Sequence, residues 1–177
     1  MSQSDPRWAD VQIGNSQARL GDFGCLVTCI AMLSDYFDCY QAPDDIASHA
    51  GWFTDEGKLI WINSEFPNFS FRWREGNIIT NKPARNDELS QAYLPNANNN
   101  EAKAALVAVA HNSHWVLPLA YDAHDRDYLA IDPADGAIIK VLEKYQAITA
   151  SGHFVRWSDR THQAWWRKGR PLAPDYQ

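Results

Sequence analysis

One helical pattern dominates the first part of the chain. Between residues 22 and 38, apolar residues recur at spacings of four, three and four, which places them on one face of a helix. Asp22 stands at the start of this pattern, where a side-chain oxygen is a suitable N-cap. A second, short helix is expected within residues 42–53, with Pro43 near its start. The apolar face of the first helix consists of Leu26, Ile30, Leu33 and Phe37.

The pattern changes after residue 103 to short apolar runs separated by polar or turn residues. Such runs predict strands, and their close spacing predicts an antiparallel meander. A short helical piece and a closing strand follow within residues 143–157, and weak alternation over 71–89 is compatible with an edge strand. Because helices precede strands, we expect an α+β domain with a helix packed on an antiparallel sheet. The four runs cover residues 105–110, 115–121, 128–131 and 137–142.

Composition limits the class of protein. The 177 residues, 45% hydrophobic and 21% charged, predict a single domain over residues 1–177 with one sizeable core. A net charge of −6 argues against nucleic acid as a partner, because binding a phosphate backbone requires a basic face. Three cysteines without a CxxC pair argue against a disulfide framework.

The N-terminal sequence bears on localisation. "MSQSDPRWADVQIG" lacks a charged start followed by an apolar run, and no stretch approaches the roughly 18 apolar residues of a membrane span. We therefore expect a soluble chain made in the cytoplasm without a signal peptide. Action on a cell wall would then require release or delivery by another system.

Tryptophan is unusually frequent, with 8 residues among 177. Large rings commonly fill a mixed core, and that is the simpler interpretation of this content. The alternative is that some tryptophan and tyrosine side chains line a groove for sugar or peptide. The sequence does not choose between the two.

Cys25 is the first candidate for chemistry. A free cysteine on a helix is commonly a small buried apolar residue, and Cys29 and Cys39 fit that description. Cys25 differs because it falls in the first turn of the expected helix, where unpaired N–H groups and the helix dipole stabilise a thiolate. Gly21 and Gly24 leave room for a substrate to approach the sulfur.

A thiolate enzyme also needs a base and a group that orients the base. His114 opens the run "HWVLPLAYD", and Asp132 ends the next run in "LAIDPADG". Neighbouring antiparallel strands would bring the two side chains together. Taken singly, a structural histidine and an aspartate in a turn are the ordinary interpretations. Their order after Cys25 favours a catalytic set.

Metal chemistry is the weaker hypothesis. His111 and His114 stand three residues apart, but no third zinc ligand is placed convincingly, so we expect no metal. Three aspartates in "YDAHDRD" suggest a solvated hairpin loop, with a calcium site as the alternative. These are Asp122, Asp125 and Asp127.

Four motifs together resemble one enzyme family. "QSDPRW", "GDFGCLVTCIAML", "HWVLPLAYD" and "YLAIDPADG" are similar to motifs of the papain-like cysteine peptidases of the bacteriocin-leader-processing type and their broader peptidase-like relatives. In that family a Gln precedes a Gly-Cys helix start, a His-Trp or His-Phe pair opens a strand, and Asp-Pro-x-x-Gly follows one strand later. The resemblance extends from about residue 3 to 145 and is dense only in these motifs.

The resemblance implies roles for particular residues. Cys25 would be the nucleophile, His114 the general base and Asp132 the group that orients the imidazole. Gln3 would donate to the oxyanion, although many relatives place this glutamine about six residues before the cysteine, where this chain has Arg19. Gln17 is therefore a competing donor. Gly24 and Trp115, which adjoin the cysteine and the histidine, are the expected substrate-binding residues.

The expected function is hydrolysis of an amide bond through a thioester at Cys25, by a papain-like monomer without a cofactor. A free-standing, tryptophan-rich enzyme of this size resembles phage lysins or wall-attacking effectors, which makes peptidoglycan stem peptides the expected substrate. One alternative is a protease that processes a specific protein or leader peptide. The other is a non-catalytic binding or structural module with a peptidase-like fold.

Overall fold

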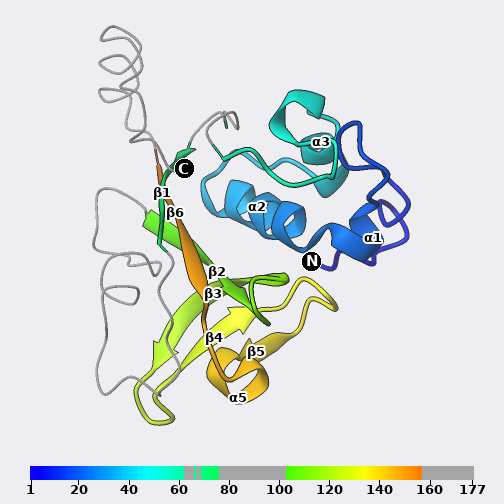
Figure 1. The fold of residues 1–177 in the computed structure, drawn as a ribbon. Helices are drawn as coiled ribbons and strands as arrows, with labels where there is room; N and C mark the ends of the chain where they lie inside the picture. The colour runs from blue at the N-terminus through cyan, green and yellow to red at the C-terminus, as the bar shows by residue number, and fades with distance from the viewer. Residues whose placement is uncertain (62–65, 67–68, 76–102, 157–177) are drawn as a thin grey trace, which may run out of the picture.

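The computed structural model describes residues 1–61, 66, 69–75 and 103–156. Its fold is α+β: short helices from the N-terminal part gather beside a sheet built from later segments (Figure 1). The expected α+β class is confirmed. The helices of the N-terminal part are α1 (Leu20–Phe23), α2 (Cys25–Tyr36), α3 (Pro43–Ala47) and the 3₁₀ helix η1 (Ala50–Trp52).

Six antiparallel strands form the sheet in the order β1-β6-β2-β3-β4-β5. The predicted meander is confirmed as β2 to β5, and the closing strand β6 returns to pair with β2 and with the edge strand β1. One predicted run is split, because β5 stops after three residues and helix α5 (Val141–Tyr145) follows at once. The strands are β1 (Phe69–Glu75), β2 (Lys103–Val109), β3 (His114–Asp122), β4 (Asp127–Ile131), β5 (Ile138–Lys140) and β6 (Ala150–Arg156).

The start of the main helix differs from the prediction. Asp22 is not its N-cap: it lies exposed in α1, and Gly24 separates α1 from α2. A Cβ atom at Gly24 would lie 2.4 Å from the Leu20 carbonyl oxygen, so glycine alone lets the chain pass this closely. The break makes Cys25 the first residue of α2.

The two faces of the sheet are covered by different helices. On one face α2 contributes Ile30 and Leu33, and Phe37 directly follows the helix; all three are nearly or fully buried, so most of the predicted apolar stripe faces the core. On the other face, Val141 of α5 packs with residues of β2, β3 and β4. Strand side chains alternate between the two faces, as their period of two requires.

The described tryptophans mostly fill the core. Trp8 and Trp115 are 4% and 7% exposed, and Trp61 contacts the ring of Trp115 at 5.4 Å between centroids. Trp52 stacks on His49. These placements agree with core filling as the role of these rings. The side chain of Trp73, and Trp157, Trp165 and Trp166, lie outside the described residues.

No helix in the described ranges is long and apolar enough to cross a membrane.

Candidate active site

Two cysteines one turn apart on α2 have different surroundings. Cys29 is fully buried, its sulfur donates to the Trp115 carbonyl at 3.5 Å, and burial raises the pKa of its thiol. Cys25 lies at the N-terminus of the helix, 8% exposed, beside His114. Cys39 follows the helix and is half-buried. Position on the helix thus distinguishes Cys25 from the other two cysteines, as the sequence predicted.

His114 links the cysteine to the aspartate. It opens β3, and β3 pairs with β4 in a register that sets Leu117 opposite Ile131, so Asp132 comes to lie near His114. Its Nε2 lies 2.7 Å from Asp132 Oδ1, so Nδ1 is the ring nitrogen that Asp132 does not occupy. Burial acts to lower the pKa of His114, but the hydrogen bonds with Cys25 and Asp132 outweigh it, and the net pKa is raised.

Asp132 is buried and accepts four hydrogen bonds. Oδ1 accepts from His114 and from the Ala134 backbone N–H at 3.0 Å. Oδ2 accepts from Lys144 Nζ at 2.7 Å and from the Tyr145 hydroxyl at 2.6 Å. Burial acts to raise the pKa of Asp132, yet hydrogen bonds led by those from Lys144 and Tyr145 hold it well below its usual range. Asp132 therefore stays ionised.

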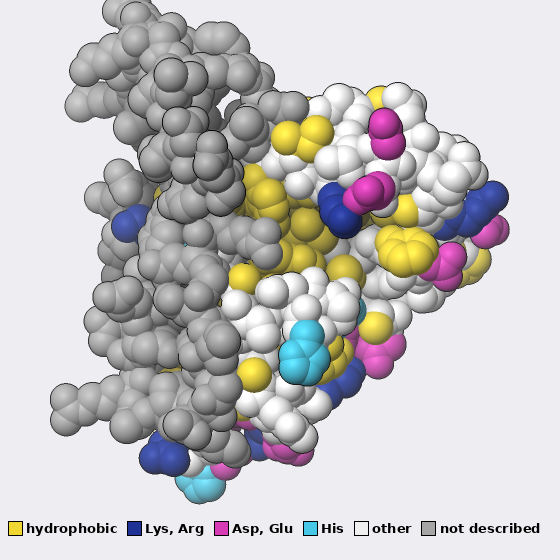
Figure 2. All heavy atoms as spheres, viewed as in Figure 1, with side chains coloured by type: hydrophobic (Ala, Val, Ile, Leu, Met, Phe, Trp, Pro, Cys, Tyr) yellow, Lys and Arg dark blue, Asp and Glu magenta, His cyan; other side chains and the backbone are white. Residues whose placement is uncertain are grey.

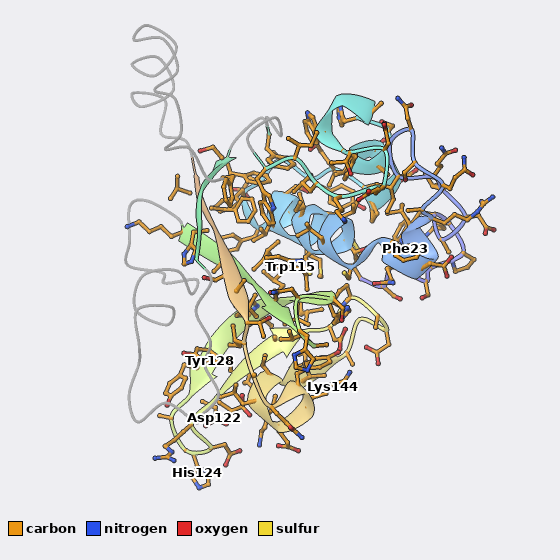
Figure 3. The ribbon with its side chains drawn as sticks, in the orientation of Figure 1. Phe23, Trp115, Asp122, His124, Tyr128 and Lys144 are labelled. Carbon is orange, nitrogen blue, oxygen red and sulfur yellow. The ribbon has the colours of Figure 1, made fainter. Side chains whose placement is uncertain are left out.

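Sequence reasoning missed Lys144 and Tyr145. Both belong to α5, a segment that looked like an ordinary short helical piece between two strands. Figure 3 shows Lys144 on this helix, beside the strands β4 and β5. A signal was present in the sequence, because a lysine and a tyrosine stand shortly after the Asp-Pro-x-x-Gly turn. Only the fold reveals that they reach the aspartate.

Gln3 is held firmly near the same turn. It is 8% exposed; its backbone N–H donates to the Pro133 carbonyl at 2.7 Å, and its side-chain Nε2 donates to the Gly21 carbonyl at 2.8 Å. Trp8 is buried, and its Nε1 donates to the Ser2 carbonyl at 2.9 Å. The first eight residues therefore pack beside Asp132 and α1, as a donor role for Gln3 requires. The amide nitrogen carries a second N–H besides the one that it donates to Gly21.

Gln17, the competing donor, has a different environment. Gln17 is exposed. The turn that contains it packs closely against Gly57: a Cβ atom on Gly57 would lie 2.8 Å from Oγ of the neighbouring Ser16. The burial of Gln3 and the exposure of Gln17 favour Gln3 as the oxyanion donor.

The two expected substrate-binding residues are placed differently. Gly24 directly precedes Cys25 and is buried. Trp115 instead lies between α2 and the sheet (Figure 3), which makes it a core residue and no longer a candidate for substrate contact. Phe23, 67% exposed on α1 two residues before the cysteine, is an apolar surface beside the site that the sequence did not single out.

An apolar cavity of about 470 Å³ lies apart from this chemistry. It is lined by the later part of α2, including Met32 and Tyr36, and by β3 and β4 residues such as Leu119. Figure 2 shows apolar side chains gathered in the hollow between the helical part and the sheet. Cys25 and His114 are not among its lining residues.

The other polar candidates do not form a metal centre. Among the described residues, no group of three His, Cys, Asp or Glu side chains is arranged to hold a metal ion. His111 is exposed, whereas its expected partner His114 is engaged by Asp132. The aspartates of "YDAHDRD" are not one solvated loop: Asp125 pairs with Lys140, and Asp127 is buried and accepts backbone hydrogen bonds from α5.

No protein-family model matches the chain, and comparisons with curated proteins and with solved structures give no significant match. The resemblance to papain-like peptidases therefore rests on the four motifs. A functional assignment has to come from the geometry of Cys25, His114 and Asp132.

Proposed function

We propose that the protein is a papain-like cysteine hydrolase that cleaves an amide bond through a thioester at Cys25. The observation that carries this proposal is the 2.7 Å pairing of His114 with the buried Asp132, together with the influence of Cys25, at the start of α2, on the raised pKa of His114. A thiol at a helix N-terminus, an imidazole beside it and an ionised carboxylate behind the imidazole are the three parts of nucleophilic acyl transfer. A binding module has no need of this alignment.

In the first half of the reaction, Cys25 Sγ attacks the carbonyl carbon of the scissile amide, and His114 Nδ1 takes the thiol proton. The tetrahedral oxyanion accepts hydrogen bonds from the backbone N–H at the start of α2 and from the Gln3 amide. The imidazolium then gives its proton to the amide nitrogen, and the C–N bond breaks. The amine leaves, and the acyl group stays on sulfur as a thioester.

In the second half, a water molecule attacks the thioester carbonyl carbon, and His114 accepts a proton from that water. The C–S bond breaks, the acid product leaves, and the proton returns to the Cys25 sulfur. Asp132 stays ionised throughout and holds His114 Nε2 toward its own Oδ1, which assigns the proton transfers to Nδ1. No redox partner is consumed in this sequence.

Peptidoglycan stem peptides are the substrate that we propose. Zymography of the purified chain on peptidoglycan, beside a casein gel, tests this proposal. We expect clearing on peptidoglycan that Cys25→Ala abolishes and that Cys39→Ala, a matched control at a half-buried cysteine, preserves. Cysteine-dependent clearing of casein alone would move the substrate to protein. No cysteine-dependent cleavage of either would favour the binding module.

A further inference from the structure

The strongest unexplained feature is the convergence of two neighbouring side chains on one oxygen atom. Lys144 Nζ and the Tyr145 hydroxyl lie 2.7 and 2.6 Å from Asp132 Oδ2. Consecutive helical residues point about 100° apart, so both reach one atom only if the helix end is aimed at the aspartate. An ordinary surface ion pair, which contributes little to stability, does not require this arrangement.

The position of α5 is itself fixed by a second buried aspartate. Asp127 Oδ1 accepts the Leu142 N–H at 2.8 Å, and its Oδ2 accepts the Glu143 N–H at 2.9 Å. These N–H groups belong to the first turn of α5, where no partner exists within the helix. Asp127 begins β4 and Asp132 follows its end, so the same strand holds the start of α5 and receives its last two side chains.

We propose that Lys144 and Tyr145 are positioning residues that orient the Asp132 carboxylate toward His114. With Oδ2 occupied by their two donors and Oδ1 fixed by the Ala134 N–H, the carboxylate cannot rotate about its Cβ–Cγ bond without breaking hydrogen bonds. Oδ1 is thereby held 2.7 Å from His114 Nε2. This inference rests on the proposed function, because an oriented imidazole matters only if Cys25 reacts.

The two residues act on His114 in different ways. Lys144 carries a positive charge that offsets part of the negative charge of Asp132, so its removal leaves a stronger field to stabilise the imidazolium. Tyr145 contributes a neutral donor: burial and the hydrogen bond to Asp132 raise the pKa of its phenol, which therefore stays protonated. The centroid of its ring also lies 5.7 Å from the centroid of the His114 imidazole.

The groups that face His114 come from three elements. Cys25 faces it from α2, Asp132 from the turn after β4, and Tyr145 from α5. Lys144 acts through Asp132, and Asp135 acts on Tyr145. A change in the pKa of His114 after substitution of Lys144 therefore combines the lost charge of Lys144 with its effect on Asp132, and Lys144→Arg, which keeps the charge, separates the two.

The test is an NMR titration of the His114 imidazole in the full chain, combined with the rate at which iodoacetamide alkylates Cys25, followed by mass spectrometry. Lys144→Met should raise the pKa of His114, and Lys144→Arg should restore it. Lys140→Met is the matched control, because Lys140 pairs with Asp125 and not with Asp132. Tyr145→Phe should slow alkylation of Cys25 about tenfold or more, because the imidazole loses its orientation.

The inference fails if Lys144→Met and Tyr145→Phe leave both the pKa of His114 and the alkylation rate at wild-type values. A lower melting temperature without either change would mean a structural role and would equally overturn it. Failure of the proposed function would give a different result, because the wild-type chain would then cleave neither peptidoglycan nor casein. The titration of His114 reports on Lys144 and Tyr145 even in that case.

Discussion

The two halves of the site hold their reactive groups by different means. Cys25 is placed by the backbone: Gly24 passes against Leu20, and the helix that follows fixes the direction of the thiol. Asp132 is placed by donors, three from side chains and one from the backbone. The helical half should therefore be sensitive to added volume, and the sheet half to the loss of charge or of a donor.

The largest effect is expected in the sheet half. Asp132→Asn replaces an acceptor of four hydrogen bonds by an amide that cannot accept on both sides, so the imidazole loses its tautomer and orientation. Turnover should fall on the order of 10³- to 10⁴-fold. Asp135→Asn, in the same turn but exposed, is the control and should retain activity. Comparable turnover in both variants would remove Asp132 from the mechanism.

The proposed oxyanion donor, Gln3, gives the next largest effect; it bonds both to Pro133 after β4 and to Gly21 of α1. Gln3→Ala should lower kcat about a hundredfold with KM little changed, because the interaction is made in the transition state. Gln17→Ala should leave both constants near wild type, since that side chain is exposed. The measurement is steady-state kinetics on the substrate found by zymography. The reverse result would transfer the donor role to Gln17.

A smaller effect, on the free energy of unfolding, tests the close approach of Gly24 to Leu20 in the helical half. Gly24→Ala puts a Cβ 2.4 Å from the Leu20 carbonyl oxygen and should lower the free energy of unfolding by about 1–3 kcal/mol. Gly51→Ala is the matched control, because its Cβ would meet nothing within 4 Å. Urea denaturation of both variants measures the difference. Equal stability would show that α1 and α2 can shift apart at little cost.

The smallest effect concerns substrate contact at Phe23. Removing this exposed ring by Phe23→Ser should raise KM a few-fold and leave kcat and the melting temperature unchanged, because the ring contributes binding area and little to folding. Tyr40→Ser, at a 54% exposed residue beyond the other end of α2, should change neither constant. An unchanged KM in Phe23→Ser would exclude this surface from binding.

The sequence predicted what periodicity and turn chemistry determine. The helix after Gly24, the meander and the order of Cys25, His114 and Asp132 follow from local patterns, and the structure brings these three residues together. The helix start was wrong, because Asp22 has good capping chemistry but the close approach of Gly24 to Leu20 is a tertiary contact. Local pattern is informative only where tertiary packing agrees with it.

Tertiary contacts between residues far apart in the chain could not be predicted from this sequence. Three residues show this: Lys144, Tyr145 and Trp115. The first two reach Asp132 because Asp127 holds α5 from the opposite end of β4, an arrangement that involves residues far apart in the chain. Trp115 looked like a substrate contact because it adjoins His114. Side chains alternate along a strand, however, and its ring lies on the face that packs against α2.

The central claim is that His114 activates Cys25, and residue-resolved alkylation tests it most directly. Wild-type chain and His114→Ala are treated with limiting iodoacetamide at pH 6, and each cysteine is quantified by mass spectrometry. We predict that Cys25 is the main modified residue in wild type and that His114→Ala slows its modification on the order of a hundredfold. Equal rates in the two proteins, or predominant modification of Cys39, would contradict the claim.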